Sequence, residues 1–246
     1  MKERKRYKKQ KTYWDHAGEV GYGEAQFSTR AVEDQIMTKH WEAVIDTAKI
    51  LGLSNDSTIL ELGCGDGKFS ETVLANYFKY INAFDISEPA INRAKSFSKS
   101  GKVSYAAQDI TKYPFDEDAY WDGAIMLAFL HHVKDYAPTI ISRVAKVCPK
   151  VIVVEPNGSN IIRKTLELLP SYQRAGENSF KLKELVSLFN ANQYTLKTFQ
   201  RITFMPPFLP QPLLPLFKKL ESLMESNTLL SRLCATHVLG FERTSD

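Results

Sequence analysis

The chain has 246 residues, 43% of them hydrophobic and 24% charged, with a formal net charge of +4, which is typical of a globular protein with a substantial interior. It has no apolar run of about 18 residues and no apolar N-terminal core, so neither a membrane-spanning helix nor a secretion signal is predicted. Three widely spaced cysteines, Cys64, Cys148 and Cys234, argue against a disulfide framework and favour a reducing cytoplasm.

The first eleven residues carry most of the basic charge. Seven of them are Lys or Arg and one is Glu, a net charge of +6 that leaves −2 for the rest of the chain. We expect residues 1–11 to be a disordered basic arm, with contact to RNA or to an anionic membrane as the alternatives. Because the body is mildly acidic, nucleic acid is not the expected partner.

Apolar periodicity alternates between the helical and the strand pattern along the chain. Helical spacing occurs over residues 31–53, 69–78, 88–97 and 136–147. Short apolar runs typical of buried strands are residues 58–62, 80–86, 103–107, 121–127 and 151–155. This alternation predicts an α/β fold with a doubly wound, mostly parallel sheet, whose ligands bind beyond the carboxyl ends of the strands.

The stretch LELGCGDGKFS, residues 60–70, places three glycines directly after the first strand. Its spacing does not fit a phosphate-binding P-loop, which needs four residues between its glycine and Gly-Lys. A dinucleotide is disfavoured as well, because Glu61 would lie near the pyrophosphate. S-adenosylmethionine, with an ammonium and a sulfonium, suits the site better: Glu61 can accept from the ammonium, and the glycine amides can donate to the ligand carboxylate.

These residues, with the ends of the later strands, resemble the class I S-adenosylmethionine-dependent methyltransferases over residues 55–157. The resemblance implies a seven-stranded sheet, with residues 195–204 and 234–242 as an antiparallel edge hairpin. It implies that Asp85 accepts from the ribose hydroxyls and that Ile86 packs on the adenine face. It also implies that Asp109 accepts from the adenine amino group and that the N–H of Ile110 donates to a ring nitrogen. The other implied cofactor-binding residues are Glu61, Gly63, Cys64, Gly65, Gly67 and Leu127.

His131 and His132 follow the fourth strand, at the expected mouth of the site. One of them is a candidate catalytic base, with His131 slightly ahead, because neutral imidazole accepts protons near pH 7. A capping or packing histidine is the favoured alternative. The stretch LHHV resembles the branch of the family that acts on small-molecule or lipid-like acceptors, so O-methylation is expected. No metal-ligand spacing occurs, so no metal site is expected.

We expect one methyltransferase domain over residues 12–246. Residues 12–54 would form an N-terminal lid and helix, with Tyr13, Trp14 and Tyr22 as lid candidates, and residues 55–157 the cofactor-binding core. Residues 158–246 would form a substrate-side cap and the hairpin, with an insertion at residues 205–233. The acceptor-binding candidates are Asn157, Tyr172 and Glu177.

Within the insertion, prolines precede a helix that begins near Pro215. Its apolar face, formed by Leu216, Leu220, Leu223 and Met224, is expected to pack on the core or on a second copy of the chain. A flap for an apolar acceptor, or contact with a membrane surface, is the alternative.

The sequence thus favours a cytoplasmic S-adenosylmethionine-dependent methyltransferase, with peripheral membrane association and oligomer formation left open. An RNA or protein methyltransferase using the basic arm, a non-catalytic cofactor-binding module and a dehydrogenase are the alternatives.

Overall fold

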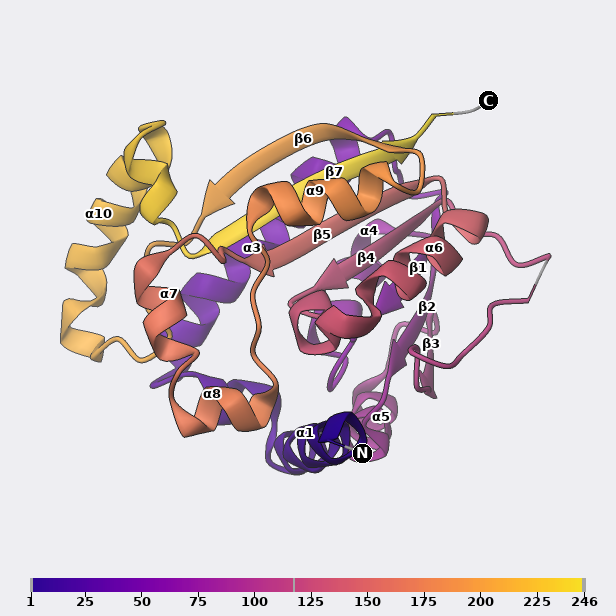
Figure 1. Ribbon diagram of the computed structural model, residues 1–246, viewed down its shortest axis with the longest axis horizontal. Helices are drawn as coiled ribbons and strands as arrows, with labels where there is room; N and C mark the ends of the chain where they lie inside the picture. The colour runs from indigo at the N-terminus through magenta and orange to yellow at the C-terminus, as the bar shows by residue number, and fades with distance from the viewer. Residues whose placement is uncertain (1, 117, 245–246) are drawn as a thin grey trace.

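The computed structural model describes residues 2–116 and 118–244, and its centre is a seven-stranded sheet in the order β3-β2-β1-β4-β5-β7-β6 (Figure 1). Within those residues β7 is the one strand that runs opposite to the other six, so its pairs with β5 and β6 are antiparallel. The strands are β1 (Thr58–Leu62), β2 (Tyr80–Asp85), β3 (Val103–Ala107), β4 (Gly123–Leu127), β5 (Lys150–Pro156), β6 (Tyr194–Ile202) and β7 (Thr236–Arg243). The predicted seven-stranded, mostly parallel sheet is confirmed.

Helices cover both faces of this sheet, so it is doubly wound. One face packs on α6 (Ala137–Val147) and α9 (Leu182–Asn190), and the other on α3 (Arg30–Ile50), a π-helical turn η1 (Ser70–Leu74), α4 (Ala75–Tyr77) and α5 (Glu88–Phe97). The central strands are buried on both sides, which is why they read as continuous apolar runs in the sequence. The strand order reverses between β1 and β4, and the carboxyl ends of these two strands define the place where a ligand binds in such sheets.

The N-terminal segment is helical rather than a disordered arm. Helix α1 (Lys2–Val20) includes residues 2–11, which corrects the expectation for that stretch. Its second half packs along α5 and α8 (Pro170–Ala175), with Trp14 and Ala17 buried. Lys, Arg, Glu and Gln are good helix formers, so the helix can extend from its packed second half back through the basic residues 2–11. A short helix, α2 (Tyr22–Gln26), connects α1 to α3.

The cap elements lie beyond the carboxyl ends of the parallel strands (Figure 1). They are α7 (Ile161–Leu166), α8, the turn η3 (Gln211–Leu213), α10 (Leu214–Ser226) and the turn η4 (Leu230–Leu233). The turn η2 (Leu130–Tyr136) connects β4 to α6.

Helix α10 begins at Leu214, as the proline pattern indicates, but only part of the predicted apolar face is turned inward: Leu220 and Met224 are half-buried, whereas Leu216 and Leu223 are exposed. Its buried residue is Glu221, whose Oε1 accepts the backbone N–H groups of Phe204 and Met205 at 2.9 and 3.2 Å. Lys39 of α3 lies 3.0 Å from Glu221 Oε2. This carboxylate satisfies backbone donors that follow β6, so it faces inward, and Leu216 and Leu223 face solvent instead.

Gly67 and Gly101 allow a paired test of the turn that opens η1. Gly67 has a φ of +75°, and a Cβ there would lie 2.7 Å from Ala94 Cβ and 2.8 Å from Tyr105 Oη. Gly101 has a similar φ of +67° but open space around it. We expect Gly67→Ala to lower the free energy of unfolding by about 3 kcal/mol, from backbone strain plus overpacking, and Gly101→Ala by about 1 kcal/mol, from strain alone.

Urea unfolding measures both variants. Equal losses would contradict the close packing of Gly67 against α5 and β3.

Candidate active site

A cavity of about 1090 Å³ opens at the carboxyl ends of the strands. This volume lies at the upper end of the range for ligand pockets, so it can hold more than one small ligand. One half is bounded by the loops after β1, β2 and β3, and we call it the nucleoside half. The other half lies between α3 and residues 203–217, and we call it the apolar chamber.

The glycine loop bounds the nucleoside half. Gly63 and Gly65 have φ values of +78° and +57°, and the Gly65 N–H donates to Asp85 Oδ2 at 2.9 Å. A Cβ on Gly65 would lie 3.5 Å from the ring of Tyr22, in the space between the loop and the lid. Gly67 is not among the lining residues and serves the turn into η1. Glycine is therefore needed here both for left-handed backbone and for a ligand to approach the loop.

Asp85 ends β2 at the wall of the cavity and is 9% exposed. Its Oδ1 accepts the N–H of Ser87 at 2.9 Å, and its Oδ2 accepts that of Gly65. Burial raises the pKa of this carboxyl, although these backbone N–H bonds oppose the shift. Each oxygen retains a second lone pair, so Asp85 can still accept from the two hydroxyls of a ribose.

The remaining predicted cofactor residues, apart from Glu61 and Gly67, also line the cavity. Ile86 and Ile110 supply apolar surface, and Asp109 accepts the N–H and hydroxyl of Thr111 at 3.1 and 2.6 Å. Leu127 ends β4 nearby. Cys64 is buried, and burial raises the pKa of its thiol, as do the carboxylates of Glu61 and Asp85; it is a packing residue and not an activated nucleophile.

The position of Glu61 differs from the expectation that its carboxylate contacts the ligand ammonium. It is 2% exposed, is not among the residues that line the cavity, and accepts the hydroxyl of Ser70 at 2.6 Å. Burial raises its pKa to about 7; the Ser70 hydrogen bond opposes that shift, and Asp85 adds to it. The side chain therefore joins β1 to the turn η1 beneath the glycine loop.

Trp14 and Tyr22, two of the lid candidates, both line the nucleoside half. Their rings are stacked with centroids 5.4 Å apart, and Trp14 Nε1 donates to the carbonyl of Ala175 at 3.2 Å. Tyr13 packs edge-on against Trp14 but is not a lining residue. Lid and cap thus meet above the cavity.

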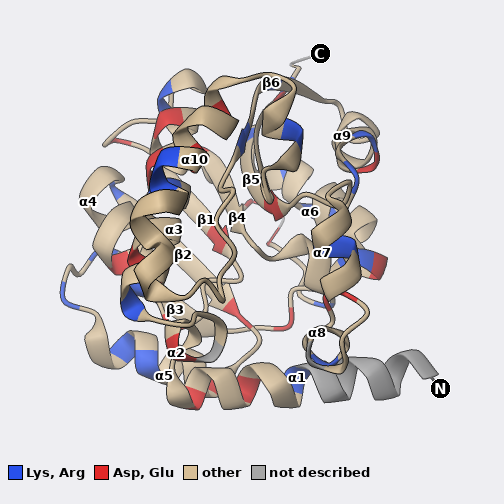
Figure 2. Cartoon of the chain, turned by 90° about the vertical axis from the view of Figure 1, so that its left-hand side faces the viewer, with Lys and Arg blue, Asp and Glu red and all other residues tan. Residues whose placement is uncertain are grey.

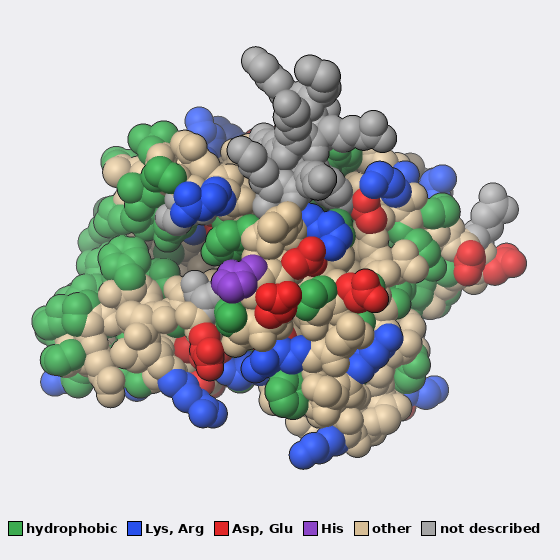
Figure 3. Space-filling model, turned by 90° about the horizontal axis from the view of Figure 1, so that it is seen from below, with side chains coloured by type: hydrophobic (Ala, Val, Ile, Leu, Met, Phe, Trp, Pro, Cys, Tyr) green, Lys and Arg blue, Asp and Glu red, His purple; other side chains and the backbone are tan. Residues whose placement is uncertain are grey.

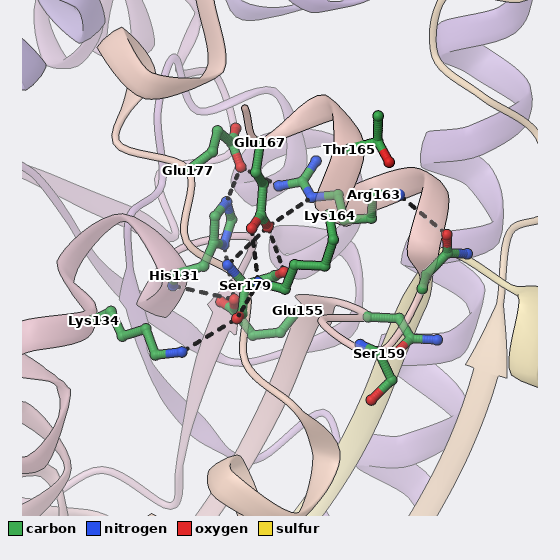
Figure 4. A network of polar contacts seen from close by, with 12 residues as sticks. His131, Lys134, Glu155, Ser159, Arg163, Lys164, Thr165, Glu167, Glu177 and Ser179 are labelled. Atoms are coloured by element: carbon green, nitrogen blue, oxygen red, sulfur yellow. Dashed lines mark hydrogen bonds and ion pairs between the residues drawn. The ribbon is translucent and has the colours of Figure 1, made fainter. Parts of the chain in front are cut away.

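His131 lies in a buried network of charges rather than free at the mouth of the site (Figure 4). Its Nδ1 lies 2.8 Å from Glu155 Oε2, and its Nε2 lies 3.1 Å from Glu177 Oε2. Although burial opposes the charge, Glu155 and Glu177 raise the pKa of His131 to about 9. His131 is therefore an imidazolium near pH 7 with both nitrogens engaged, and it cannot accept a proton from a substrate.

The same network connects the cap to the sheet. Glu177, which precedes α9, also pairs with Arg163 of α7, and Arg163 lies 3.4 Å from Glu167. Although burial opposes ionisation, the charge of His131 lowers the pKa of Glu177. Tyr172 of α8 packs near the guanidinium of Arg163, 5.3 Å away. Glu177 and Tyr172 line the cavity, so this part of the cap forms one wall of it.

Asn157 is not an acceptor-binding residue, which corrects another expectation. It is 1% exposed, and its Nδ2 donates to the carbonyls of Arg232 and Cys234 at 3.2 and 2.9 Å. It therefore anchors the turn η4 to the end of β5 and does not line the cavity.

The sequence did not point to His40, a polar group in the apolar chamber. Its Nε2 lies 3.2 Å from Thr203 Oγ1 and 3.3 Å from Thr236 Oγ1. Burial, with a contribution from Lys39, lowers its pKa to about 4, so the imidazole is neutral. His132 is neutral too, because burial and the charge of His131 lower its pKa to about 3. His40 lies on a helix predicted only as packing, so nothing in its sequence context placed it near the sheet ends.

The walls of the apolar chamber come from segments far apart in the chain. Met37 and Trp41 of α3 face the residues that follow β6, including Phe204 and Met205, and Phe217 of α10. The helical spacing of residues 31–53 predicted an apolar face but not which part of it would stay open.

Among the described residues, His131, His132 and Glu177 also bring three ligand atoms of the kind that metals prefer within 4.8 Å of one another. Arg163 and the protonated His131 already neutralise Glu177 at this point. The arrangement is that of a compensated ion-pair network, in which a further cation would be repelled.

The nucleoside half fits S-adenosylmethionine on the chemistry of its residues. Asp85 and Asp109 supply acceptors for hydroxyl and amino groups, and the glycine loop leaves room for close approach. Asp66 adds a carboxylate of the glycine loop to the lining, so a pyrophosphate at this loop would meet a like charge.

Comparison with known proteins agrees with this geometry. Residues 59–150 match the family model described as a methyltransferase domain. An uncharacterized methyltransferase of Mycobacterium tuberculosis is 31% identical over 104 residues, which cover 42% of this chain and 50% of that relative. The ubiquinone biosynthesis O-methyltransferase of Rickettsia conorii is 24% identical over 163 residues, covering 55% and 56%. The chain thus spans about half the length of the curated relatives it matches.

Among solved structures, magnesium protoporphyrin IX methyltransferase from Synechocystis, with S-adenosylhomocysteine bound, aligns with a TM-score of 0.57 at 15% identity. The alignment covers 87% of this chain and 85% of that one, and it shows a common fold. Residues 59–150 are thus similar to a methyltransferase domain, and the sheet that carries them has the fold of a solved S-adenosylmethionine-dependent methyltransferase.

The raised pKa of Glu61 predicts an unusual pH dependence. A carboxyl whose folded-state pKa of about 7 exceeds its ordinary 4.5 stabilises the fold fully below about pH 4.5, and this contribution is lost as the pH rises through 7. Glu61→Gln keeps an acceptor for Ser70 without the charge. We expect it to raise the free energy of unfolding by about 2 kcal/mol at pH 8 and to leave it nearly unchanged at pH 5.

Denaturant unfolding at the two pH values measures this, with the exposed Glu42→Gln as the control. A Glu61→Gln effect that is the same at both pH values would contradict the buried, proton-binding carboxyl.

Proposed function

We propose that this protein transfers the methyl group of S-adenosylmethionine to an oxygen of a small acceptor with an apolar body. The observation that carries the proposal is the continuity of the cavity: the nucleoside half and the apolar chamber open into each other beside the end of β4. Two binding halves that meet at one point are what a group transfer between two bound molecules requires.

The nucleoside half supports the cofactor side of the proposal. S-adenosylmethionine supplies an activated methyl group, so the residues of the chain need only bind, orient, exclude water and remove a proton. Asp85 would hold the ribose, Ile86 and Ile110 would enclose the adenine, and Asp109 would accept from its amino group. Trp14 and Tyr22 would exclude water from above.

The apolar chamber supports the acceptor side. Its walls are largely apolar and aromatic. Arg30 and Glu33 at the start of α3 also line the cavity, and His40 forms a polar cluster with Thr203 and Thr236. Such a lining selects an acceptor with an apolar body and one or two polar atoms. The 24% identity with an enzyme named as an O-methyltransferase favours oxygen as the methylated atom.

We assign the role of proton acceptor to His40 and not to His131. His131 is already protonated, whereas His40 is neutral and, with Thr203 and Thr236, forms a hydrogen-bonding cluster in the chamber. An acceptor hydroxyl that joins this cluster can be oriented by the hydroxyl groups. As its oxygen bonds to the methyl group and the methyl–sulfur bond breaks, its proton becomes acidic and can pass to the imidazole. His132, packed against Trp14 with ring centroids 4.5 Å apart, is the second neutral imidazole at the cavity.

Two experiments on binding and turnover test the proposal. We expect calorimetry to show binding of S-adenosylmethionine and none of a nicotinamide dinucleotide. We expect Asp85→Asn to weaken S-adenosylmethionine binding about 10- to 100-fold, because a hydrogen bond to a charged group is lost, and the exposed Asp56→Asn to leave it unchanged.

Incubation with labelled S-adenosylmethionine and a metabolite and lipid extract then identifies the acceptor by mass spectrometry. Label found on RNA or protein, and abolished by deleting residues 1–11, would support the nucleic-acid or protein alternative. Binding without any transfer would make the protein a cofactor-binding module.

Substitutions of the three histidines test the proton acceptor once the acceptor molecule is known. We expect His40→Gln to lower kcat about 100-fold or more with unchanged affinity for S-adenosylmethionine, since that is the usual size of general-base catalysis. His131→Gln should lower the free energy of unfolding by about 3 kcal/mol, because it breaks a buried ion pair. A loss of kcat in His132→Gln with none in His40→Gln would return the role to His132.

A further inference from the structure

Large apolar side chains are exposed at the cap end of the molecule. Of the fifteen such side chains found among the described residues, ten lie in residues 161–169 and 208–233, which we call the cap surface. They include Ile161, Leu168 and Leu229, which are 82%, 73% and 68% exposed. Figure 3 shows hydrophobic side chains gathered at the left-hand end of the molecule, where Figure 1 places α10 and α7.

The inward turn of Glu221 explains why α10 exposes two of its leucines. The Glu221 carboxylate is committed to the N–H groups of Phe204 and Met205 and to Lys39. With that side of the helix buried, Leu216 and Leu223 are 54% and 56% exposed. Leucines on the outer side of a helix, opposite a buried carboxylate, indicate that this side contacts an apolar partner as well as water.

The exposed charges between these apolar side chains are basic. In residues 205–233, all of which the structure describes, the charged residues classed as exposed are Lys218, Lys219 and Arg232. The two acidic residues of that stretch, Glu221 and Glu225, both pair with Lys39. Figure 2 faces this end of the molecule, with blue bands on α10.

The cap surface is continuous with the apolar chamber. Ile162, Phe208 and Leu233 line the cavity and are also 64%, 53% and 52% exposed. The mouth of the chamber therefore opens among the exposed apolar side chains of α7, the segment before η3, and η4.

We propose that the cap surface docks on an anionic lipid bilayer and that the apolar acceptor enters the chamber from that bilayer. Aliphatic side chains interspersed with Lys and Arg match an interface of acyl chains and anionic headgroups. A second copy fits less well, because a twofold interface would bring together two surfaces whose exposed charges are both basic. The acceptor route rests on the proposed function, whereas the lipid contact does not. Among the described residues no helix is long and apolar enough to cross a bilayer, so the contact is peripheral.

Co-sedimentation with vesicles tests the docking. We expect the full chain to bind vesicles of phosphatidylcholine with phosphatidylglycerol, and to bind phosphatidylcholine alone at least tenfold more weakly. Leu216→Ser with Leu223→Ser should abolish most binding, and Lys218→Gln with Lys219→Gln should weaken it about 30-fold, at about 1 kcal/mol per basic residue. Neither pair lines the cavity, and the control is Ile50→Ser, an exposed site on α3 outside the cap surface.

Unchanged unfolding midpoints and unchanged affinity for S-adenosylmethionine would show that these variants remain folded. Equal binding to both vesicle types, or vesicle binding unchanged by the leucine pair, would overturn the proposal. So would a dimer in sedimentation velocity that the leucine pair dissociates, without any vesicle binding. Vesicle binding by a chain that does not bind S-adenosylmethionine would contradict the proposed function while leaving the docking intact.

Discussion

The buried carboxylate of Glu155 is the constraint on which the site depends. It ends β5 at 1% exposure and accepts the N–H groups of Phe129, Leu130 and His131, at 3.0, 2.7 and 3.2 Å, together with the His131 ring. A buried charge of this kind is tolerated only when it is compensated and hydrogen-bonded. Glu155 therefore fixes the turn after β4, where Ala128 has a φ of +52°. Through His131 and Glu177 it also holds the cap over the cavity.

Asp85 acts in the same way on the other side of the switch point. It ends β2 and binds the N–H of Gly65, in the loop after the neighbouring strand β1. Glu155 ends β5 and binds the loop after its own neighbour, β4. Each of the two loops that flank the switch point is thus held by a carboxylate from the next strand outward. The cavity lies where these two loops meet, which is why a doubly wound sheet places a ligand there.

The sequence predicted the core of the fold and most of the nucleoside half, because those features depend on local patterns. Buried strands read as apolar runs, and Asp85 and Asp109 follow such runs directly. What the sequence could not show are long-range pairings. The sequence around Glu61 is the same whether its carboxylate contacts a ligand or Ser70. Which of the two it contacts depends on the packing beneath η1.

The same limit explains the other corrections. Asn157 and Glu221 both bind backbone groups that lie distant in the chain, so their neighbours in the sequence carry no sign of it. The sequence left His131 open as a candidate base because its partners Glu155 and Glu177 are 24 and 46 positions away. The apolar chamber was hidden for a related reason: it forms between α3 and the segment after β6, whose apposition follows from the strand order and not from either segment alone.

The most direct test of the account is a crystal structure with S-adenosylhomocysteine. The account predicts the ribose hydroxyls on Asp85, the amino-acid end at the glycine loop, and an open apolar chamber beside the sulfur with His40 on its wall. A nucleoside bound in the chamber between α3 and residues 203–217, or one that leaves Asp85 without a ligand contact, would contradict it.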